Sequence, residues 1–331
     1  MSKPIFLSAS RIETFSTCSQ LYSAKYNWRI PDFGNDGSNR GSVVHDVLEL
    51  LAKPRHKKRY DDAINHGSCK DVPVLWKLVK RFAVKYRVND EANLKMIDGF
   101  IMVALYNHFF GPKETVSVHA EKEFSIQVNE PGKRFNVRGV IDKIFEIAEA
   151  GISYVEGMDF KSSKKKFEDD KLDHNLQSYI YQIALRRMFP KAVLRRFHFL
   201  FLKFAKDPIQ EQPVFTEEQL SGFETQLSQY QVAMENFTLA QENSNLALYD
   251  ENKKWLCGAE GNKKDGAPKF ICSARKPLDY FVLLDEEGEF VASAFTEAEL
   301  NPKEGQIIVP RSYPGCVGYY NQKTGLRRNC N

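Results

Sequence analysis

The chain has 331 residues, and its 47 basic and 43 acidic side chains give a net charge of +4. Hydrophobic residues make up 42% of the sequence and charged residues 27%, values close to the averages of globular proteins. This composition excludes a disordered, collagen-like or disulfide-scaffold chain. The length fits one large domain with additions or two smaller domains.

The apolar stretches of the sequence are short. Residues 100–106 and 197–202 fall well below the roughly 18 residues that a membrane-spanning segment needs. The first ten residues lack the apolar core of a signal peptide. We therefore expect no membrane segment and a cytoplasmic location.

The first third of the chain has the apolar spacing of helices. The pattern predicts helices at residues 10–26, 42–51, 72–86 and 91–110, with a turn-rich segment before the second. His45 lies on the second of these helices.

The middle of the chain changes to β-rich runs. Strands are predicted at residues 116–128, 135–147 and 152–160, because Pro131-Gly132 and Ala150-Gly151 separate three runs of β-branched and aromatic residues. The remaining predicted elements are a helix at 172–188, an aromatic strand at 194–204, a polar helix at 217–243 and a hairpin around residues 286–288.

Two aspartates lie on neighbouring predicted strands. Asp142 is within one strand and Asp159 is near the end of the next, so the turn between the strands allows the two carboxylates to converge. Asp159 and Lys161 are two positions apart and project from the same face of an extended strand, with Phe160 on the other face. An acid and a base therefore share one edge.

This arrangement suits the hydrolysis of a phosphodiester. Mg²⁺ and Mn²⁺ prefer oxygen ligands, which Asp142, Asp159 and the carbonyl of Phe160 supply. Lys161 then orients the attacking water or neutralises charge on the scissile phosphate. Taken alone, an Asp and a Lys two positions apart also fit a solvated ion pair at a strand end.

Several separated motifs occur in a characteristic order. They are LSASRIETFSTCSQLYSAKY at residues 7–26, GSVVH at 41–45, RGVID at 138–142, MDFK at 158–161 and QSYIY at 177–181. This ordered set resembles the RecB-like branch of the PD-(D/E)XK nuclease superfamily, which includes exonucleases associated with CRISPR adaptation and many bacteriophage exonucleases.

The resemblance implies a fold and a domain arrangement. The expected fold is α/β, a restriction-endonuclease-like core in which helices flank a mixed sheet, with a helical N-terminal insertion and a C-terminal extension. We place the nuclease core at residues 1–250, including the insertion at about 53–112, and the extension at 251–331.

The resemblance also implies roles for the motif residues. His45, Asp142 and Asp159 would bind the metal, and Lys161 would be the catalytic base or would position the water. Gln177 and Tyr181, one helical turn apart, would contact DNA or support the site. The chain departs from the family pattern at two places. Asp159 occupies a position where the family often has Glu, and Ser162 and Ser163 are followed by three lysines. Of these lysines, Lys164 and Lys165 add positive charge for DNA binding.

Some members of this branch hold a four-iron four-sulfur cluster through one cysteine of the first helix and three near the C-terminus. Cys18, Cys257 and Cys272 are the expected ligands here, while Cys316 and Cys330 are further thiols in the same region. Isolated core thiols are the alternative interpretation, and Cys69 belongs in the core under both.

The function expected from the resemblance is that of a divalent-metal-dependent DNA nuclease in the cytoplasm of a bacterial or infected host cell. An exonuclease acting on single-stranded DNA or on DNA ends, in recombination, repair or phage DNA metabolism, fits best, and a recombination or single-strand-annealing protein is the expected partner. Two alternatives stay open: a noncatalytic DNA-binding or assembly protein that keeps the nuclease fold, and a metal-stabilised structural protein.

Overall fold

A computed structural model describes residues 4–32, 34–107, 109–258 and 272–319. Contacts between Cα atoms divide the chain into two compact units, one of residues 1–9 with 34–231 and the other of residues 10–33 with 232–331. The boundaries expected from the sequence, at residues 53–112 and 250, stay predictions. In the part of the chain that the structure describes, no helix is both long and apolar enough to cross a bilayer.

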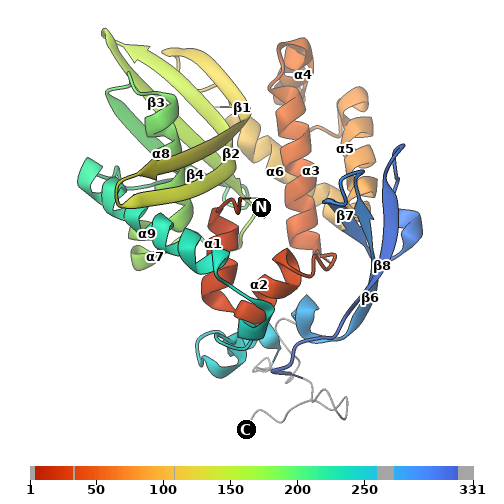
Figure 1. Cartoon of the computed structure of the whole chain (residues 1–331). Helices are drawn as coiled ribbons and strands as arrows, with labels where there is room; N and C mark the ends of the chain where they lie inside the picture. Colours follow the sequence, from red (N-terminus) through yellow and green to blue (C-terminus); the bar gives the residue numbers. More distant parts are fainter. Residues whose placement is uncertain (1–3, 33, 108, 259–271, 320–331) are drawn as a thin grey trace. The chain divides into compact units, whose positions relative to one another are not determined.

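The first unit contains the predicted helical region. Its helices are α3 (Asp36–Leu51), α4 (Lys57–His66), α5 (Pro73–Lys85) and α6 (Glu91–Tyr106). Helix α3 begins earlier than the predicted residue 42, because the Asn35 side chain accepts a hydrogen bond from the Ser38 amide while the Ser38 hydroxyl bonds back to the Asn35 backbone. Figure 1 shows α3, α5 and α6 side by side.

The sheet of this unit confirms the predicted strand order. Its five strands run in the order β1-β2-β3-β4-β5, with β3 and β4 parallel and the other pairs antiparallel. The strands are β1 (Thr115–Glu130), β2 (Lys133–Glu149), β3 (Ile152–Lys161), β4 (Leu194–Phe201) and β5 (Ile209–Glu211). Strand β4 ends before the predicted residue 204. The helices α7 (Asp169–Asp173) and α8 (Leu176–Met188) connect β3 to β4.

Both faces of this sheet are covered. Phe145, Met158 and Phe160 are buried in one hydrophobic cluster with residues of α3, α5 and α6. On the other face, α8 packs on β3 and β4, and the rings of Tyr181 and Phe197 lie 5.2 Å apart. A mixed sheet between helical layers is the predicted α/β architecture.

The first predicted helix is divided in the structure. Instead of one helix over residues 10–26, α1 (Ala9–Thr17) and α2 (Ser19–Tyr26) are separated by Cys18, whose backbone is extended with φ −158° and ψ 115°. The amide of Ser19 donates to the carbonyl of Asn245 at 2.6 Å, which a continuous helix would not permit. Ser19 and Asn245 are far apart in the sequence, so the local spacing of apolar residues did not reveal the break in the helix.

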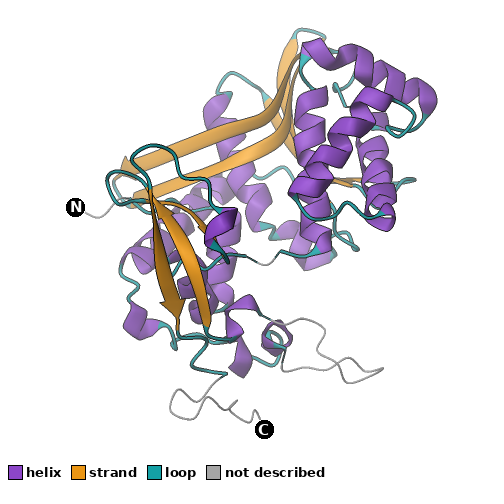
Figure 2. Cartoon of the chain, turned by 90° about the vertical axis from the view of Figure 1, so that its right-hand side faces the viewer, coloured by secondary structure: helices purple, strands orange, loops and turns teal. Residues whose placement is uncertain are grey.

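The second unit also contains a three-stranded antiparallel sheet in the order β7-β6-β8 (Figure 2). Its strands are β6 (Leu278–Leu284), β7 (Phe290–Ala294) and β8 (Ile307–Tyr313), and the turn at Gly288 between β6 and β7 is the predicted hairpin. Most of helix α9 (Glu217–Glu235) belongs to the first unit. It ends before the predicted residue 243, and Thr238 caps a short 3₁₀ helix, Leu239–Gln241, in the second unit.

Candidate metal-dependent active site

The neighbouring strands β2 and β3 bring Asp142 and Asp159 together. Their ladder runs from Glu149–Ile152 to Lys143–Met158, and one further step would set Asp142 opposite Asp159. The ladder ends there, and the backbone amide of Phe160 donates to Asp142 Oδ2 at 2.6 Å instead. Each aspartate side chain is only 7% exposed. The end of this strand pair therefore holds two carboxylates in a site with little water.

Lys161 is held beside Asp159 by a hydrogen-bond network. Its Nζ lies 2.6 Å from Asp159 Oδ2 and donates to Gln177 Oε1 at 2.6 Å. The Gln177 amide donates to Asp159 Oδ1 at 2.7 Å and to the Tyr181 hydroxyl at 2.8 Å, while Tyr181 donates to the carbonyl of Val140 at 2.7 Å. Helix α8 thus fixes the carboxylate and the ammonium group relative to each other.

A glycine of the RGVID motif permits this approach of α8. A Cβ atom on Gly139 would lie 2.7 Å from the ring of Phe124 and 3.5 Å from the ring of Tyr181. The first distance is far below ordinary van der Waals contact. The absence of a side chain at residue 139 therefore lets the Phe124 ring pack directly on β2, edge-on to Tyr181.

Helix α3 supplies His45 from the other layer. The neighbouring Val44 and Val47 are fully buried, so the helix is anchored by its apolar face while the half-buried imidazole reaches the strand end. His45 Nδ1 lies 3.3 Å from Asp142 Oδ1 and 3.5 Å from Glu121 Oε1. Its ring is 5.8 Å from the ring of Phe160.

Glu121 is a member of the site that sequence reasoning missed. It lies on β1 between Ala120 and Lys122, which pair with Lys143 and Ile141, but Glu121 itself does not pair with Asp142. Its φ of +47° is in the left-handed region, which costs a non-glycine residue energy. The two-residue turn at Pro131-Gly132 fixes the hairpin register, so counting back from Asp142 across that turn leads to Glu121.

Three of these side chains form a compact ligand group. His45, Glu121 and Asp142 each offer one atom, and these atoms all lie within 4.8 Å of one another. Asp159 lies next to the group, but its two oxygens contact Lys161 and Gln177.

The electrostatics of the group favour a cation. The pKa of the Asp142 carboxyl is raised to about 6, chiefly by burial and also by the charge of Asp159, while His45 opposes the shift. Burial disfavours a charged His45 ring, yet Asp142 and Glu121 outweigh burial and raise the pKa of His45 to about 11. Carboxylates that share a low-dielectric site require positive charge.

The donor set fits a divalent metal ion, because carboxylate oxygens and an imidazole nitrogen are common ligands of such ions. His45, Glu121 and Asp142 would hold such an ion, with Asp159 at the boundary of the group. The amide of Phe160 donates to Asp142, while metal binding by the Phe160 carbonyl stays a prediction. The DNA-binding roles of Lys164 and Lys165, in the exposed segment after β3, also stay predictions.

Comparison with known proteins gives the family. A profile described as "PD-(D/E)XK nuclease superfamily" matches residues 6–257, which include every motif of the site. The chain belongs to the PD-(D/E)XK nuclease superfamily. No curated protein matches the chain.

Two solved structures resemble this PD-(D/E)XK chain at low identity. A crystal structure of a "Putative exonuclease" from Eubacterium rectale has 12% sequence identity and a TM-score of 0.41, covering 73% of this chain and 82% of that chain. The crystal structure of SSO0001 has 16% identity and a TM-score of 0.28, covering 54% and 84% respectively. Neither likeness carries an argument about function.

Membership of the superfamily gives the site its general chemistry. PD-(D/E)XK nucleases cleave phosphodiesters of DNA with divalent metal ions, and the group of His45, Glu121 and Asp142 offers ligands for one. Asp159 and Lys161 correspond to the second acid and the lysine in the family's name, and they lie at the end of β3, adjacent to that group.

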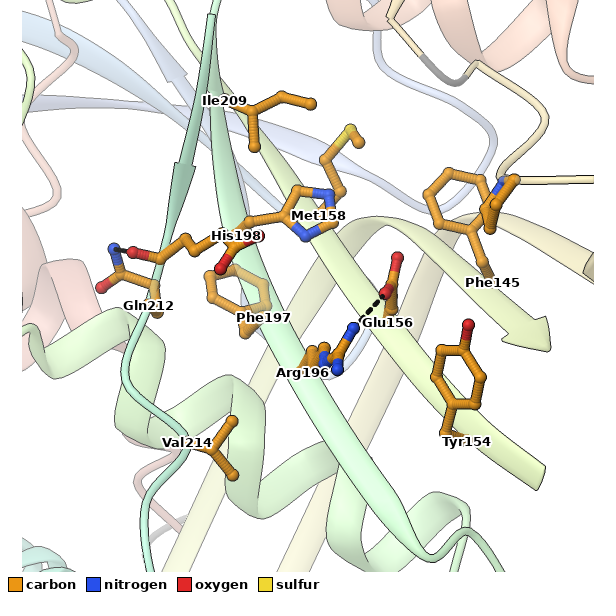
Figure 3. A pocket seen from close by; sticks show the side chains of 12 residues that line it. Phe145, Tyr154, Glu156, Met158, Arg196, Phe197, His198, Ile209, Gln212 and Val214 are labelled. Carbon is orange, nitrogen blue, oxygen red and sulfur yellow. Dashed lines mark hydrogen bonds and ion pairs between the residues drawn. The ribbon is translucent and has the colours of Figure 1, made fainter. Parts of the chain in front are cut away.

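A separate pocket of the PD-(D/E)XK core lies on β3 and β4, on the face opposite to the one that carries Asp159 and Lys161. It has a volume of about 260 Å³, and its lining includes Glu156, Met158, Arg196 and His198 (Figure 3). Glu156 and Arg196 form an ion pair at 3.6 Å. Because side chains alternate along a strand, Glu156 and Met158 point away from the face of Asp159 and Lys161. This pocket is therefore not part of the metal site.

Proposed function

We propose that this nuclease hydrolyses DNA with Mg²⁺ or Mn²⁺ and belongs to the RecB-like branch of the superfamily. The observation that carries the proposal is the ligand group of His45, Glu121 and Asp142 beside the pair of Asp159 and Lys161. Exonuclease action from a DNA end, in recombination, repair or phage DNA metabolism within the cytoplasm, is the finer proposal, and the ordered motifs GSVVH, RGVID, MDFK and QSYIY support it.

Each side chain of the site has a defined task in this mechanism. A bound divalent ion would supply Lewis-acid polarisation of the scissile phosphate and a water of lowered pKa. Lys161 would orient the attacking water and would offset negative charge that develops on the phosphate. Gln177 holds the Lys161 ammonium in place through its Oε1 atom. The buried position of Asp142 and Asp159 excludes bulk water and strengthens these electrostatic interactions.

Cleavage assays test this proposal directly. Purified protein is incubated with end-labelled linear and with circular DNA, single- and double-stranded, with and without Mn²⁺. We expect metal-dependent cleavage that requires an end, and loss of cleavage in Asp159→Asn and Lys161→Ala with unchanged thermal stability. Asp170→Asn, an exposed aspartate of α7, is the matched control and should cleave as the wild type does.

Three results would decide against parts of this proposal. Undiminished metal-dependent cleavage by both active-site variants would refute the assignment of the site. DNA retention without cleavage under any divalent ion would instead favour the noncatalytic DNA-binding alternative. Cleavage of circular DNA at the rate of linear DNA would exclude an exonuclease.

We also propose that the second unit binds an iron–sulfur cluster. Cys18, Cys257 and Cys316 lie in one buried cluster, and the thiol of Cys272 interacts electrostatically with Cys18 and Cys316. Burial raises the pKa of the Cys272 thiol to about 11, while the nearby Ala274 amide opposes this shift. No disulfide joins the five cysteines of the described segments. Four thiols distant in sequence therefore converge, and Cys316 joins the three ligands expected from the sequence.

Thiolate sulfur is a ligand of both zinc and iron–sulfur clusters, and the resemblance to members of the RecB-like branch that hold a four-iron four-sulfur cluster supports the cluster here. Cys69 lies in the core of the first unit, and Cys330 lies outside the described residues.

Spectroscopy tests the cluster. Anaerobically purified protein should have a brown colour with broad visible absorption and stoichiometric iron and sulfide, all lost in Cys18→Ser and Cys272→Ser. Cys69→Ser is the control and should retain the spectrum. Zinc in place of iron, or a colourless protein after anaerobic reconstitution, would exclude the cluster without affecting the nuclease assignment.

A further inference from the structure

A groove of about 380 Å³ lies along helix α3, next to the proposed metal ligands. Its lining includes Ser38, Gly41, Ser42 and His45 of α3, together with Ser162 just after β3. A Cβ atom on Gly41 would lie 3.3 Å from Ser162 Oγ, so the glycine lets the end of β3 approach the helix closely. The groove therefore carries neutral hydroxyl groups, which are common partners of nucleic-acid phosphates.

The carboxylate in this groove is already neutralised. Asp46 also lines the groove, but its Oδ2 accepts hydrogen bonds from Lys85 Nζ at 2.9 Å and from the Tyr86 hydroxyl at 3.1 Å. An anionic strand in the groove would therefore meet hydroxyls and a paired carboxylate, with little repulsion.

Two cations from separate segments, Arg40 and Lys164, lie near Lys203. Lys203 follows β4, Lys164 follows β3 and Arg40 is on α3 beside Gly41. Burial, together with the charges of Arg40 and Lys164, lowers the pKa of Lys203. The Lys203 ammonium also lies 5.8 Å from the ring of Phe100. The parallel strands β3 and β4 end side by side, where the Leu202 amide donates to the Lys161 carbonyl at 2.9 Å, and Ser162 lies against Gly41 beside Arg40. Arg40 and Lys164 therefore lie close enough to Lys203 for their charges to act on it.

These cations lack the counter-charges that their neighbours have. Lys166 pairs with Asp207 at 2.7 Å, whereas in the described part of the chain no carboxylate lies within 4.0 Å of Lys164 or Lys203. Arg40 Nη1 donates to the neutral amide of Asn93, and its Nε is buried without a hydrogen-bond partner among the described residues. Asn93 itself also donates to two carboxylates, those of Asp36 and Asp90.

We propose that Arg40, Lys164 and Lys203 bind a backbone phosphate of the nucleic-acid strand that lies in this groove, a phosphate other than the one that is cut. The strand would run from the metal ligands past the hydroxyls of Ser42 and Ser162 to this cationic subsite. The proposal rests on the proposed nuclease function, because it uses the scissile position as its reference point. It assigns substrate positioning to residues that lie outside the catalytic group.

Binding measurements test the subsite without turnover. A labelled single-stranded oligonucleotide is titrated in EDTA at several salt concentrations with the wild type, Lys164→Ala, Lys203→Ala and Lys191→Ala. Lys191 is the matched control, because it is exposed and precedes β4 while Lys203 follows it. We expect the Kd for the oligonucleotide to rise about three- to tenfold in the Lys164 and Lys203 variants. The slope of log Kd against log salt concentration should fall by about one unit in both variants. Lys191→Ala should change neither quantity.

A neutral phosphate identifies the contacted position. Oligonucleotides with one methylphosphonate are compared across successive positions, and one position should weaken wild-type binding but leave binding by Lys203→Ala unchanged.

The outcomes separate this proposal from the nuclease assignment. Suppose that the wild type cleaves DNA, but the Lys164 and Lys203 variants have the same Kd and salt dependence as Lys191→Ala. This result would overturn the subsite and leave the nuclease assignment intact. DNA binding that these two variants weaken, without cleavage by any form, would support the subsite while the nuclease proposal fails. Absence of wild-type DNA binding would overturn both.

Discussion

Lys161 and Gln177 are joined by a 2.6 Å hydrogen bond, in which the ammonium group donates to the side-chain carbonyl oxygen. The same Gln177 donates through Nε2 to Asp159 Oδ1 at 2.7 Å. One amide therefore bridges the base and the acid of the motif and fixes their separation. An amide suits this position because it offers an acceptor to Lys161 and a donor to Asp159.

Replacing Gln177 should slow catalysis, because Gln177 holds Lys161 in position. We expect Gln177→Ala to lower kcat about ten- to a hundredfold, because the ammonium group loses its partner and samples other positions. Gln177→Glu should be no better, since its carboxylate cannot donate to Asp159. Steady-state kinetics on linear DNA measure the effect, with the exposed Gln226→Ala as control. An unchanged kcat in Gln177→Ala would show that α8 does not position Lys161.

Glu121 should contribute to metal binding although no motif contains it. Glu121→Gln keeps the size of the side chain but removes one negative charge from the ligand group of His45 and Asp142. We expect the Mn²⁺ concentration for half-maximal activity to rise about ten- to a hundredfold, in the range of substitutions around metal sites. Metal titration of activity, together with calorimetric titration of Mn²⁺ binding, measures this. Glu123→Gln, an exposed position on the same strand, should titrate like the wild type.

Lys143 should destabilise the fold at neutral and lower pH. Its side chain is 1% exposed, its Nζ has no hydrogen-bond partner among the described residues, and the ring of Phe109 lies 3.8 Å away. Burial lowers the pKa of Lys143 to about 7, although Glu121 and Asp142 oppose this shift. The unfolded chain therefore binds a proton that the folded chain releases between pH 7 and the ordinary lysine pKa of about 10.4, so stability should rise with pH across that range.

Thermal unfolding of Lys143→Met tests this account. The variant should gain about 1–3 kcal/mol of stability at pH 7, because it removes a buried unsatisfied group. Its stability should also lack the rise between pH 7 and 10 that the wild type shows. A lower melting temperature at pH 7 would mean that the folded protein gives Lys143 a partner.

Two glycines should respond to alanine in opposite directions. A Cβ on Gly139 would meet the Phe124 ring at 2.7 Å, so Gly139→Ala should cost about 1–3 kcal/mol through overpacking and should displace Tyr181. Gly222, exposed on α9, has no atom within 4 Å of its added Cβ, so Gly222→Ala should stabilise the protein by up to about 1 kcal/mol. Chemical denaturation measures both changes, and equal effects would contradict the packing described for Gly139.

Local patterns were sufficient to predict the strands β1 to β3, the alternation that sets Asp159 and Lys161 on one face, and the helices that carry His45 and Gln177. These features depend on residues close in sequence, because side-chain periodicity and turn residues act over a few positions. The same residues, in order, were sufficient for the family assignment that the profile over residues 6–257 confirms.

Tertiary structure decided the features that join distant segments. Glu121 reaches His45 only because hairpin register and an unusual backbone angle place it there, and Ser162 lies against Gly41 only because the chain after β3 approaches α3. Cys18 interrupts a predicted helix where the chain bonds to Asn245. Such contacts form between residues with no fixed spacing in the chain, so their positions follow from packing of the whole unit and not from any local pattern.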